Sequence, residues 1–261
     1  PMTVFGPVMY EKRFGDKLKD NQSYAVRWKA HDASNDGWTF IKLVRAKNYN
    51  DYVDAIKTFE CPGQNFVFAA KSGDIAIWNQ GAFPAKWYRQ GDFVMPGEDS
   101  SYMWQGNIPI NENPHMINPP RGFVSSANQL PVDFKTYPYY LGGAYDLYRG
   151  IIVNKKLTAM NGITPQDMEQ MQTDNYNIFA ATALPLLLRN LDGTANEKKY
   201  ADILRQWNYR ADPEEKGPTV FNRLIYHFDK LVWDDDLKDH SQLPFISPHR
   251  STLIEALLRD T

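Results

Sequence analysis

The residue with the clearest chemical potential is Asn128, near the end of a loop-like segment that runs from Trp104 to Pro131. Proline fixes φ and removes a backbone donor, so the five prolines of this segment exclude a regular helix. They are Pro109, Pro114, Pro119, Pro120 and Pro131. The small and apolar residues 123–127 predict a buried strand with Asn128 at its exit. A loop that delivers an amide side chain to a strand end is a common way to build a binding or catalytic site. Taken alone, however, an Asn before a proline-containing turn favours a turn or capping role.

The residues around Asn128 resemble the β-subunit of the penicillin acylase family of N-terminal-nucleophile amide hydrolases. The pattern Trp-x-Gly-x-x-Pro-x-x-Glu-x-Pro begins at Trp104, Asn-Pro-x-x-Gly-aromatic begins at Asn118, and Asn128 precedes a proline. Further similar segments are Pro62–Ala70, Gly73–Ala76, Gly81–Pro84 and Gly142–Arg149. The resemblance extends from about Trp38 to Leu191. It implies an α+β fold, in which an antiparallel β-sheet that is part of an αββα N-terminal-nucleophile hydrolase fold is followed by a helical region.

The resemblance implies catalytic roles for Asn128 and Arg149. Amide hydrolysis passes through a tetrahedral intermediate whose negative oxygen needs preorganised donors. The carboxamide of Asn128 would be one donor, paired with a backbone N–H from elsewhere, and it cannot be lost to deprotonation. Arg149 matches an arginine that orients this Asn and acts electrostatically on the amino terminus, a task suited to a planar, permanent cation. The alternative for Arg149 is a surface ion pair with Asp146, three residues earlier.

Three further residues match positions at the family's substrate pocket: Phe40, Gln64 and Asn65. Phe40 would present an aromatic wall to an apolar acyl group, and a core role is the alternative. Gln64 departs from an apolar lining, so the acyl preference of relatives does not carry over. Asn65 matches an Asn at the start of a strand, for which a plain capping role is the alternative.

The family nucleophile is a Ser at the amino terminus of the β-chain, whose own α-amino group acts as the base. Here position 1 is Pro, Thr3 is not terminal, and no Ser lies in a Gly-x-Ser-x-Gly pattern. The sequence also begins without Met, which favours an excised piece of a longer protein. We therefore expect this chain to be inactive alone. The parent would cleave a linear amide without a dissociable cofactor, with the remainder of its α and β chains as partners.

Family substrates include β-lactam side chains, acyl-homoserine lactones and lipopeptides, and this sequence does not choose among them. A function of another class is a non-catalytic module that binds a ligand on the proline- and aromatic-rich loop. Four aromatic residues would serve such a surface: Trp87, Tyr88, Tyr102 and Trp104.

Composition excludes several other classes of protein. A chain of 261 residues with 43% hydrophobic and 14% aromatic residues can bury a sizeable core. A net charge of −2 points to neither nucleic acid nor an anionic membrane as a partner. No apolar run approaches transmembrane length, and residues 1–11 lack the core of a signal peptide. A periplasmic or secreted location follows from the resemblance alone.

Metal sites find little support in the sequence. The single cysteine, Cys61, excludes both a disulfide framework within the chain and a Cys-rich metal site. The acidic residues 234–236, with Asp239 and His240, lack the Gly turn and spacing of a calcium loop, so a solvated helix end is favoured. Relatives often carry calcium, but tyrosines occupy 137 and 139–140, where an acid is expected after Asn128. We assign no metal.

The apolar pattern divides the chain into a β-rich part over 1–141, with the Asn128 loop, and a mainly helical part over 142–261. Strands are expected at 3–5, 8–12 and 24–30, and a hairpin joins 65–70 to 74–78 around Gly73. Helical spacing covers 38–44 and 52–59, with Asn48 or Asn50 as the N-cap of the second segment. Thr164 should cap another helix, with Pro165 in its first turn. Further helices are expected within 175–191, 200–207, 220–233 and 252–258.

Overall fold

The structure is a computed structural model that describes residues 1–10, 22–142, 147–191, 193–235 and 248–259. The chain divides into two compact units, Pro1–Gly150 and Ile151–Thr261. The first contains all the named strands and the second is built from helices, whereas the sequence pattern predicts the change of character at residue 142. Among the described residues, no helix is long and apolar enough to cross a membrane.

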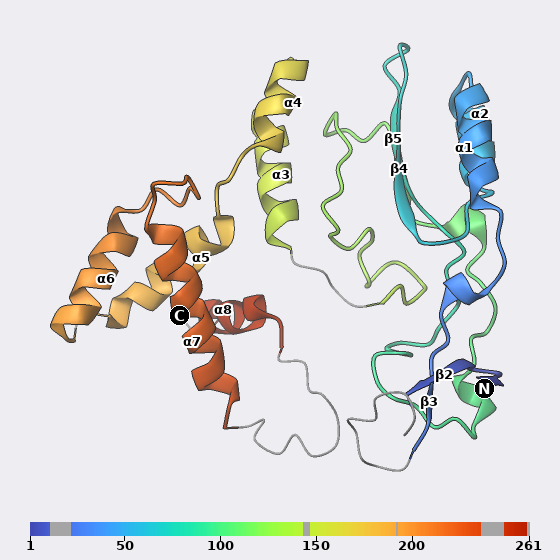
Figure 1. The fold of residues 1–261 in the computed structure, drawn as a ribbon. Helices are drawn as coiled ribbons and strands as arrows, with labels where there is room; N and C mark the ends of the chain where they lie inside the picture. The colour runs from blue at the N-terminus through green and yellow to red at the C-terminus, as the bar shows by residue number, and fades with distance from the viewer. Residues whose placement is uncertain (11–21, 143–146, 192, 236–247, 260–261) are drawn as a thin grey trace. The chain divides into compact units, whose positions relative to one another are not determined.

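The first unit holds two antiparallel sheets of three strands each (Figure 1). The smaller sheet has the order β1 (Met2–Thr3), β2 (Gly6–Tyr10) and β3 (Tyr24–Ala25). The strand expected over 24–30 is shorter than predicted. Val26 N–H still donates to Pro7 C=O at 3.0 Å, but Pro7 has no N–H with which to continue the ladder. A 3₁₀ turn, η1 (Lys29–His31), follows instead.

The larger sheet carries the residues of interest and has the order β4 (Gln64–Ala69), β5 (Ile75–Gln80) and β6 (His115–Ile117). Strands β4 and β5 form the predicted hairpin, and Gly73 lies at its turn with φ +95°. Their register places Asn65 opposite Asn79 and Val67 opposite Ile77. Because side chains alternate along a strand, these two pairs share one face of the sheet.

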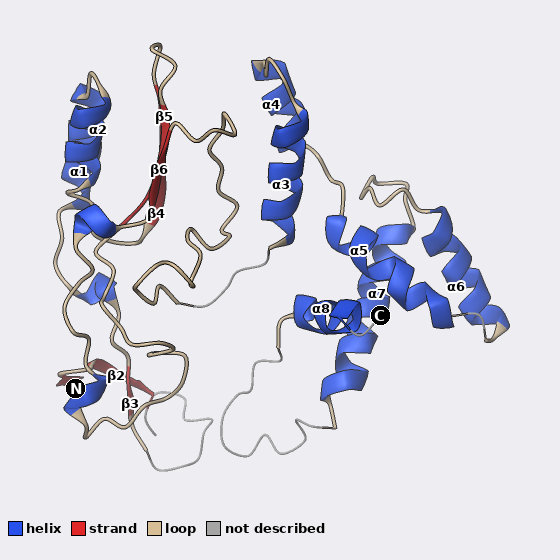
Figure 2. Ribbon diagram, turned by 180° about the vertical axis from the view of Figure 1, so that it is seen from behind, coloured by secondary structure: helices blue, strands red, loops and turns tan. Residues whose placement is uncertain are grey.

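Helices α1 (Asp36–Arg45) and α2 (Tyr49–Ile56) lie beside the opposite face of this sheet (Figures 1 and 2). Asn48 caps α2 as predicted, because its Oδ1 accepts from Asp51 N–H at 3.0 Å. Tyr52 and Ile56 are buried against Trp78 of β5. The Tyr52 hydroxyl donates to the carbonyl of Phe66 at 2.9 Å, which fixes the helix on β4.

On the other face of the larger sheet, an apolar row stays exposed within this unit. Val67, Ile77 and Met116 stand side by side in the strand register, and we call this row the open sheet face. Val67 is 60% exposed and Met116 is 41% exposed. An apolar row on a sheet normally packs against another layer, so this face is a candidate for further contacts.

The segment 118–142, after β6, contains no strand or helix. The strand predicted over 123–127 is therefore wrong. Two of the backbone groups that a strand would pair are taken by one side chain: Gln129 Oε1 accepts from Ala127 N–H at 2.6 Å, and its Nε2 donates to Ser125 C=O at 3.2 Å. Two short 3₁₀ turns, η2 (Ser100–Tyr102) and η3 (Ile110–Glu112), interrupt the earlier loop region.

The helices of the second part of the chain agree with the predicted amphipathic segments. They are α3 (Tyr148–Ala159, whose first three residues belong to the first unit), α4 (Pro165–Gln172), α5 (Ile178–Leu187), η4 (Leu188–Asn190), α6 (Ala195–Gln206), α7 (Gly217–Trp233) and α8 (Arg250–Arg259). Thr164 and Asp167 form a capping box at the start of α4, as the sequence predicts. Leu184, Trp207 and Phe221 lie in the core of this unit.

Candidate functional site

Asn128 and Arg149 lie in direct contact. Arg149, at the second residue of α3, donates from Nη2 to Asn128 Oδ1 at 2.6 Å. A cation in the first turn opposes the helix dipole, so the helix itself does not explain an arginine here, whereas the Asn128 oxygen does. Both residues are exposed in this chain. The alternative partner, Asp146, lies outside the described residues.

The contact with Arg149 decides which end of the Asn128 carboxamide is available. Its oxygen accepts from the guanidinium, so the Nδ2 hydrogens are directed elsewhere and donate to no side chain or backbone oxygen in the described part of the chain. A hydrogen bond from a cation to the oxygen also polarises the amide and strengthens its N–H groups as donors. The arrangement can therefore present a neutral, polarised donor to a negative oxygen.

Asn128 adopts an unusual backbone conformation, with φ +64°. Positive φ is uncommon outside glycine, and Asn is one of the residues that tolerate it. Such conformations persist only where surrounding contacts hold them, and they are frequent at functional sites. Asn128 thus occupies a turn, as the sequence allows, and it also contacts Arg149.

The loop that carries Asn128 is tied to the sheet through Asn65. Asn65 Nδ2 donates to Ser126 Oγ at 2.8 Å, and Asn65 Oδ1 accepts from Asn79 Nδ2 at 3.1 Å. Both ends of the Asn65 carboxamide are therefore bonded within the protein. The Asn65 side chain therefore supports the loop two residues before Asn128 and is not free to contact a substrate.

The start of the same loop is tied to the β4–β5 turn by Asn118, which has φ +44°. Its Oδ1 accepts from Ile75 N–H at 2.8 Å, and its Nδ2 donates to Asp74 Oδ1 at 2.9 Å. Hydrogen bonds from Ser72 and Asn118 lower the pKa of the Asp74 carboxyl, so it is an anion at neutral pH. The segment with Asn128 is thus anchored at the start of β4, through Asn65, and at the start of β5, through Asp74 and Ile75.

The structure separates Phe40 and Gln64 from Asn65. Phe40 packs edge-on to Phe59, with ring centroids 6.1 Å apart, and lies near Phe66 on the helix-covered side of the sheet. Gln64 pairs with the buried Gln80 on that side as well. Asn65 faces the other way because adjacent strand residues alternate. The three residues therefore do not line one pocket in this chain. Phe40 contacts Phe59 and Phe66 but is 54% exposed, so it is not a core residue in this chain.

The four aromatic residues considered for a ligand surface, Trp87, Tyr88, Tyr102 and Trp104, do not form a continuous platform. Tyr88 is 73% exposed, but Trp87 packs against Tyr102, with ring centroids 5.9 Å apart. The guanidinium of Arg27 lies 4.7 Å from the Trp104 ring centroid. Several of these rings thus serve contacts within the unit.

A calcium site after Asn128 does not fit the side chains present. Tyr137 and Tyr139 occupy the region, and both of their hydroxyls donate to Glu112, one to its carbonyl and one to its carboxylate. Burial raises the pKa of Tyr137 to about 12, so this phenol stays a neutral donor. Within the described ranges, no group of three or more His, Cys, Asp or Glu side chains is gathered as for a metal ion.

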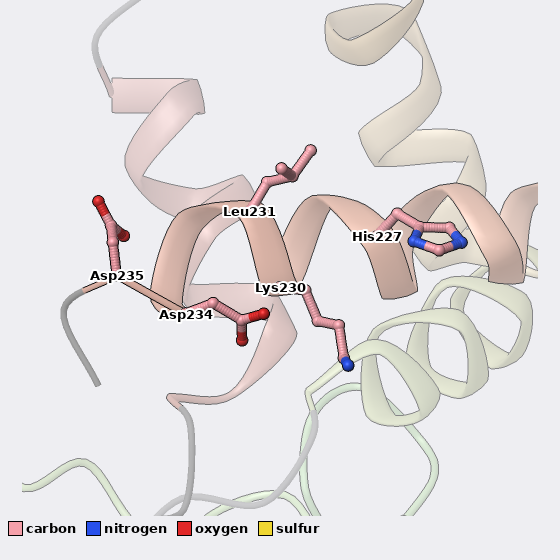
Figure 3. Close-up of a pocket in the computed structure, with 5 residues that line it drawn as sticks. All are labelled: His227, Lys230, Leu231, Asp234 and Asp235. Atoms are coloured by element: carbon pink, nitrogen blue, oxygen red, sulfur yellow. The ribbon is translucent and has the colours of Figure 1, made fainter. Parts of the chain in front are cut away.

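The acidic end of α7 forms a separate hollow (Figure 3). His227, Lys230, Leu231, Asp234 and Asp235 line it, and their polar ends point in different directions rather than at one centre. Residues 236–240, the remainder of the acidic cluster, lie outside the described residues. The five described side chains of the hollow therefore form no ligand set.

Comparison with known proteins identifies the family. The sequence model of the penicillin amidase family matches residues 2–261. The chain belongs to the penicillin amidase family. A solved structure, the thermostable penicillin G acylase of Alcaligenes faecalis, superposes with a TM-score of 0.68 at 19% identity over 99% of this chain and 51% of that chain. This likeness shows the α+β fold expected from the sequence, that of N-terminal-nucleophile hydrolases.

Curated relatives of this penicillin amidase family member are acylases. The Penicillin acylase 2 proenzyme of Pseudomonas sp. (strain SE83) is 21% identical over 209 residues, which are 80% of this chain and 27% of that protein. The acyl-homoserine lactone acylase QuiP of Pseudomonas fluorescens Pf-5 is 33% identical over 90 residues, or 34% of this chain and 11% of that protein. QuiP of Pseudomonas putida KT2440 is 30% identical over 128 residues, or 47% and 15%. The chain thus spans about a quarter or less of the length of these relatives.

Proposed function

We propose that this chain is part of an amidohydrolase that cleaves a linear amide into a carboxylic acid and an amine. Asn128 would stabilise the oxyanion, and Arg149 would orient and polarise it. The observation that carries the proposal is the 2.6 Å contact from Arg149 Nη2 to Asn128 Oδ1. It engages the amide oxygen, so the Nδ2 hydrogens remain available to donate to a substrate oxygen that gathers charge.

The nucleophile would come from another part of the parent enzyme. In the proposed reaction, an amino-terminal Ser adds to the amide carbon, and its α-amino group takes the proton. The carbonyl oxygen becomes negative and accepts from Asn128 Nδ2. The C–N bond then breaks as the amine takes that proton, and water releases the acid. No dissociable cofactor takes part in this reaction. The chain by itself would be inactive because it supplies the oxyanion donor but not the nucleophile.

The partners of this chain would be the remaining α and β segments of the parent. The open sheet face of Val67, Ile77 and Met116 supports this, because an apolar row that is 60% exposed at Val67 and 41% at Met116 is unfavourable to leave in water. Charge balance supports neither nucleic acid nor membrane as a partner. A periplasmic or secreted location is proposed from family membership.

The test is Asn128→Ala in the full-length parent enzyme. We expect kcat to fall by roughly 10²–10³, as for loss of one oxyanion donor, while KM changes little. Single-turnover release of a chromogenic amine from phenylacetyl, hexanoyl and dodecanoyl amides would measure both the effect and the acyl class. Near-normal kcat in the variant would remove Asn128 from the mechanism.

A further inference from the structure

The conformation of Asn128 needs a cause that its contact with Arg149 does not supply. A side-chain hydrogen bond can orient a carboxamide, but it does not determine the backbone φ of +64°. A residue persists in such a conformation where the groups around it hold it there. The residue next to it, Gln129, makes contacts on the other side of this bend.

Gln129 folds back over the residues that precede Asn128. Its Oε1 accepts from Ala127 N–H at 2.6 Å, and its Nε2 donates to Ser125 C=O at 3.2 Å. One carboxamide thus supplies both an acceptor and a donor to the backbone on the far side of Asn128. The result is a closed loop of chain in which Asn128 is the residue at the bend.

The same side chain is seated against the start of α3. A Cβ placed on Gly150 would lie 3.3 Å from both Cβ and Oε1 of Gln129, so the Gln129 side chain packs directly on the Gly150 backbone. Gly150 follows Arg149, the partner of Asn128. Two adjacent loop residues therefore meet two adjacent helix residues, Asn128 with Arg149 and Gln129 with Gly150.

We infer that Gln129 is a positioning residue for the oxyanion donor and that Gly150 provides the space it requires. This inference rests on the function proposed above. Gln129 does not act on the substrate itself. It holds the bend at which Asn128 presents Nδ2 and fixes the distance between the loop and the helix residue that polarises Asn128. A misplacement of a catalytic group by about 1 Å can cost on the order of 10²-fold in rate.

The test is Gln129→Met in the full-length parent enzyme, which keeps the length of the side chain and removes both hydrogen bonds. We expect kcat to fall roughly 10- to 100-fold with KM within about twofold. In an Asn128→Ala background the same change should lower kcat no further, because Gln129 acts through Asn128. A crystal structure of the Gln129→Met variant should show Asn128 out of the left-handed region or separated from Arg149.

Gln90→Met is a matched control, since Gln90 also bridges backbone groups within a loop. It accepts from Trp87 N–H at 3.1 Å and donates to Tyr102 C=O at 2.8 Å, in a different loop. Its loss should lower thermal stability but not kcat per folded enzyme. If Gln129→Met prevents folding, Gly150→Ala pushes on the same side chain more gently and should lower kcat several-fold.

The kinetics of these variants distinguish the role of Asn128 from that of Gln129. Near-normal kcat in Asn128→Ala overturns the proposed function. A collapse of kcat in Asn128→Ala, combined with normal kcat in Gln129→Met or with a loss that adds fully to that of Asn128→Ala, overturns the role of Gln129 alone.

Discussion

Asn65 Nδ2 donates to Ser126 Oγ at 2.8 Å. The second residue of strand β4 thus holds the loop two residues before Asn128. The other end of the Asn65 carboxamide accepts from Asn79, its cross-strand neighbour, at 3.1 Å. The sheet thereby transmits its rigidity to a loop that has no regular structure of its own. Sites supported in this way hold their geometry better than sites on an unsupported loop.

We expect Asn65→Ala in the parent enzyme to lower kcat several-fold and to leave KM nearly unchanged, because the loop loses one support but the substrate loses no contact. A single hydrogen bond of this kind contributes about 1 kcal/mol to stability. Steady-state kinetics of Asn65→Ala, Ser126→Ala and the double variant would measure the effect, and the double variant should match the singles. A large rise in KM with normal kcat would instead place Asn65 at the substrate.

Arg149→Lys should lower kcat by about tenfold although it keeps the charge. The ammonium is a compact point charge without the planar fork, so it orients the Asn128 oxygen less well. Arg149→Met, which also removes the polarising cation, should lower kcat further. Arg45→Lys, at the exposed last turn of α1, is the control and should leave kcat unchanged. Equal activity of the wild-type and Arg149→Met enzymes would contradict the assigned role.

The isolated chain should hydrolyse neither phenylacetyl nor fatty-acyl amides, since the proposed reaction takes its nucleophile from elsewhere. The assay is release of a chromogenic amine, with the parent enzyme as the positive control. Turnover that scales with the concentration of the purified chain, and is lost on Asn128→Ala, would mean that a nucleophile lies within these 261 residues.

How far the sequence predicts the structure depends on whether the information is local. The hairpin around Gly73 and the caps at Asn48 and Thr164 follow from short patterns, and all three are present. The strand expected over 123–127 failed because apolar residues alone do not specify a strand. They also need a partner for their backbone, and here Gln129 takes that place.

The same distinction between local patterns and distant contacts applies to the candidate site. Asn128 and Arg149 could be found from motif order, and they do meet. The sequence does not indicate the supporting contacts, because the partners are distant in sequence, as Ser126 is from Asn65. The contact with Asn79 can be predicted, since the register of the predicted hairpin places Asn79 opposite Asn65. The sequence could not show that Phe40 and Asn65 face opposite sides of one sheet, because that depends on where α1 docks.

In the helical unit, the Asp174 carboxylate accepts hydrogen bonds from both Lys156 and Arg210. Asp174 has a side chain that is only 12% exposed. Burial alone would raise its pKa, but the hydrogen bonds from the two cations prevail and lower it from 3.8. The carboxylate therefore stabilises the fold at a pH above its unfolded pKa, and this contribution is lost as pH falls through the folded pKa.

Asp174→Asn should accordingly lower the free energy of unfolding by about 1–3 kcal/mol at pH 7. The difference from the wild-type chain should shrink below about pH 4 and vanish once the wild-type carboxyl is protonated. Urea unfolding of this chain at pH 7, 5, 4 and 3, followed by circular dichroism, would measure both. Asp202→Asn is the control: its carboxylate pairs with Arg205 on the surface of α6 and is 62% exposed, so it should change stability little at any pH. A gap between the wild-type chain and the Asp174→Asn variant that persists unchanged at pH 3 would show that the ionised carboxylate is not what joins Lys156 to Arg210.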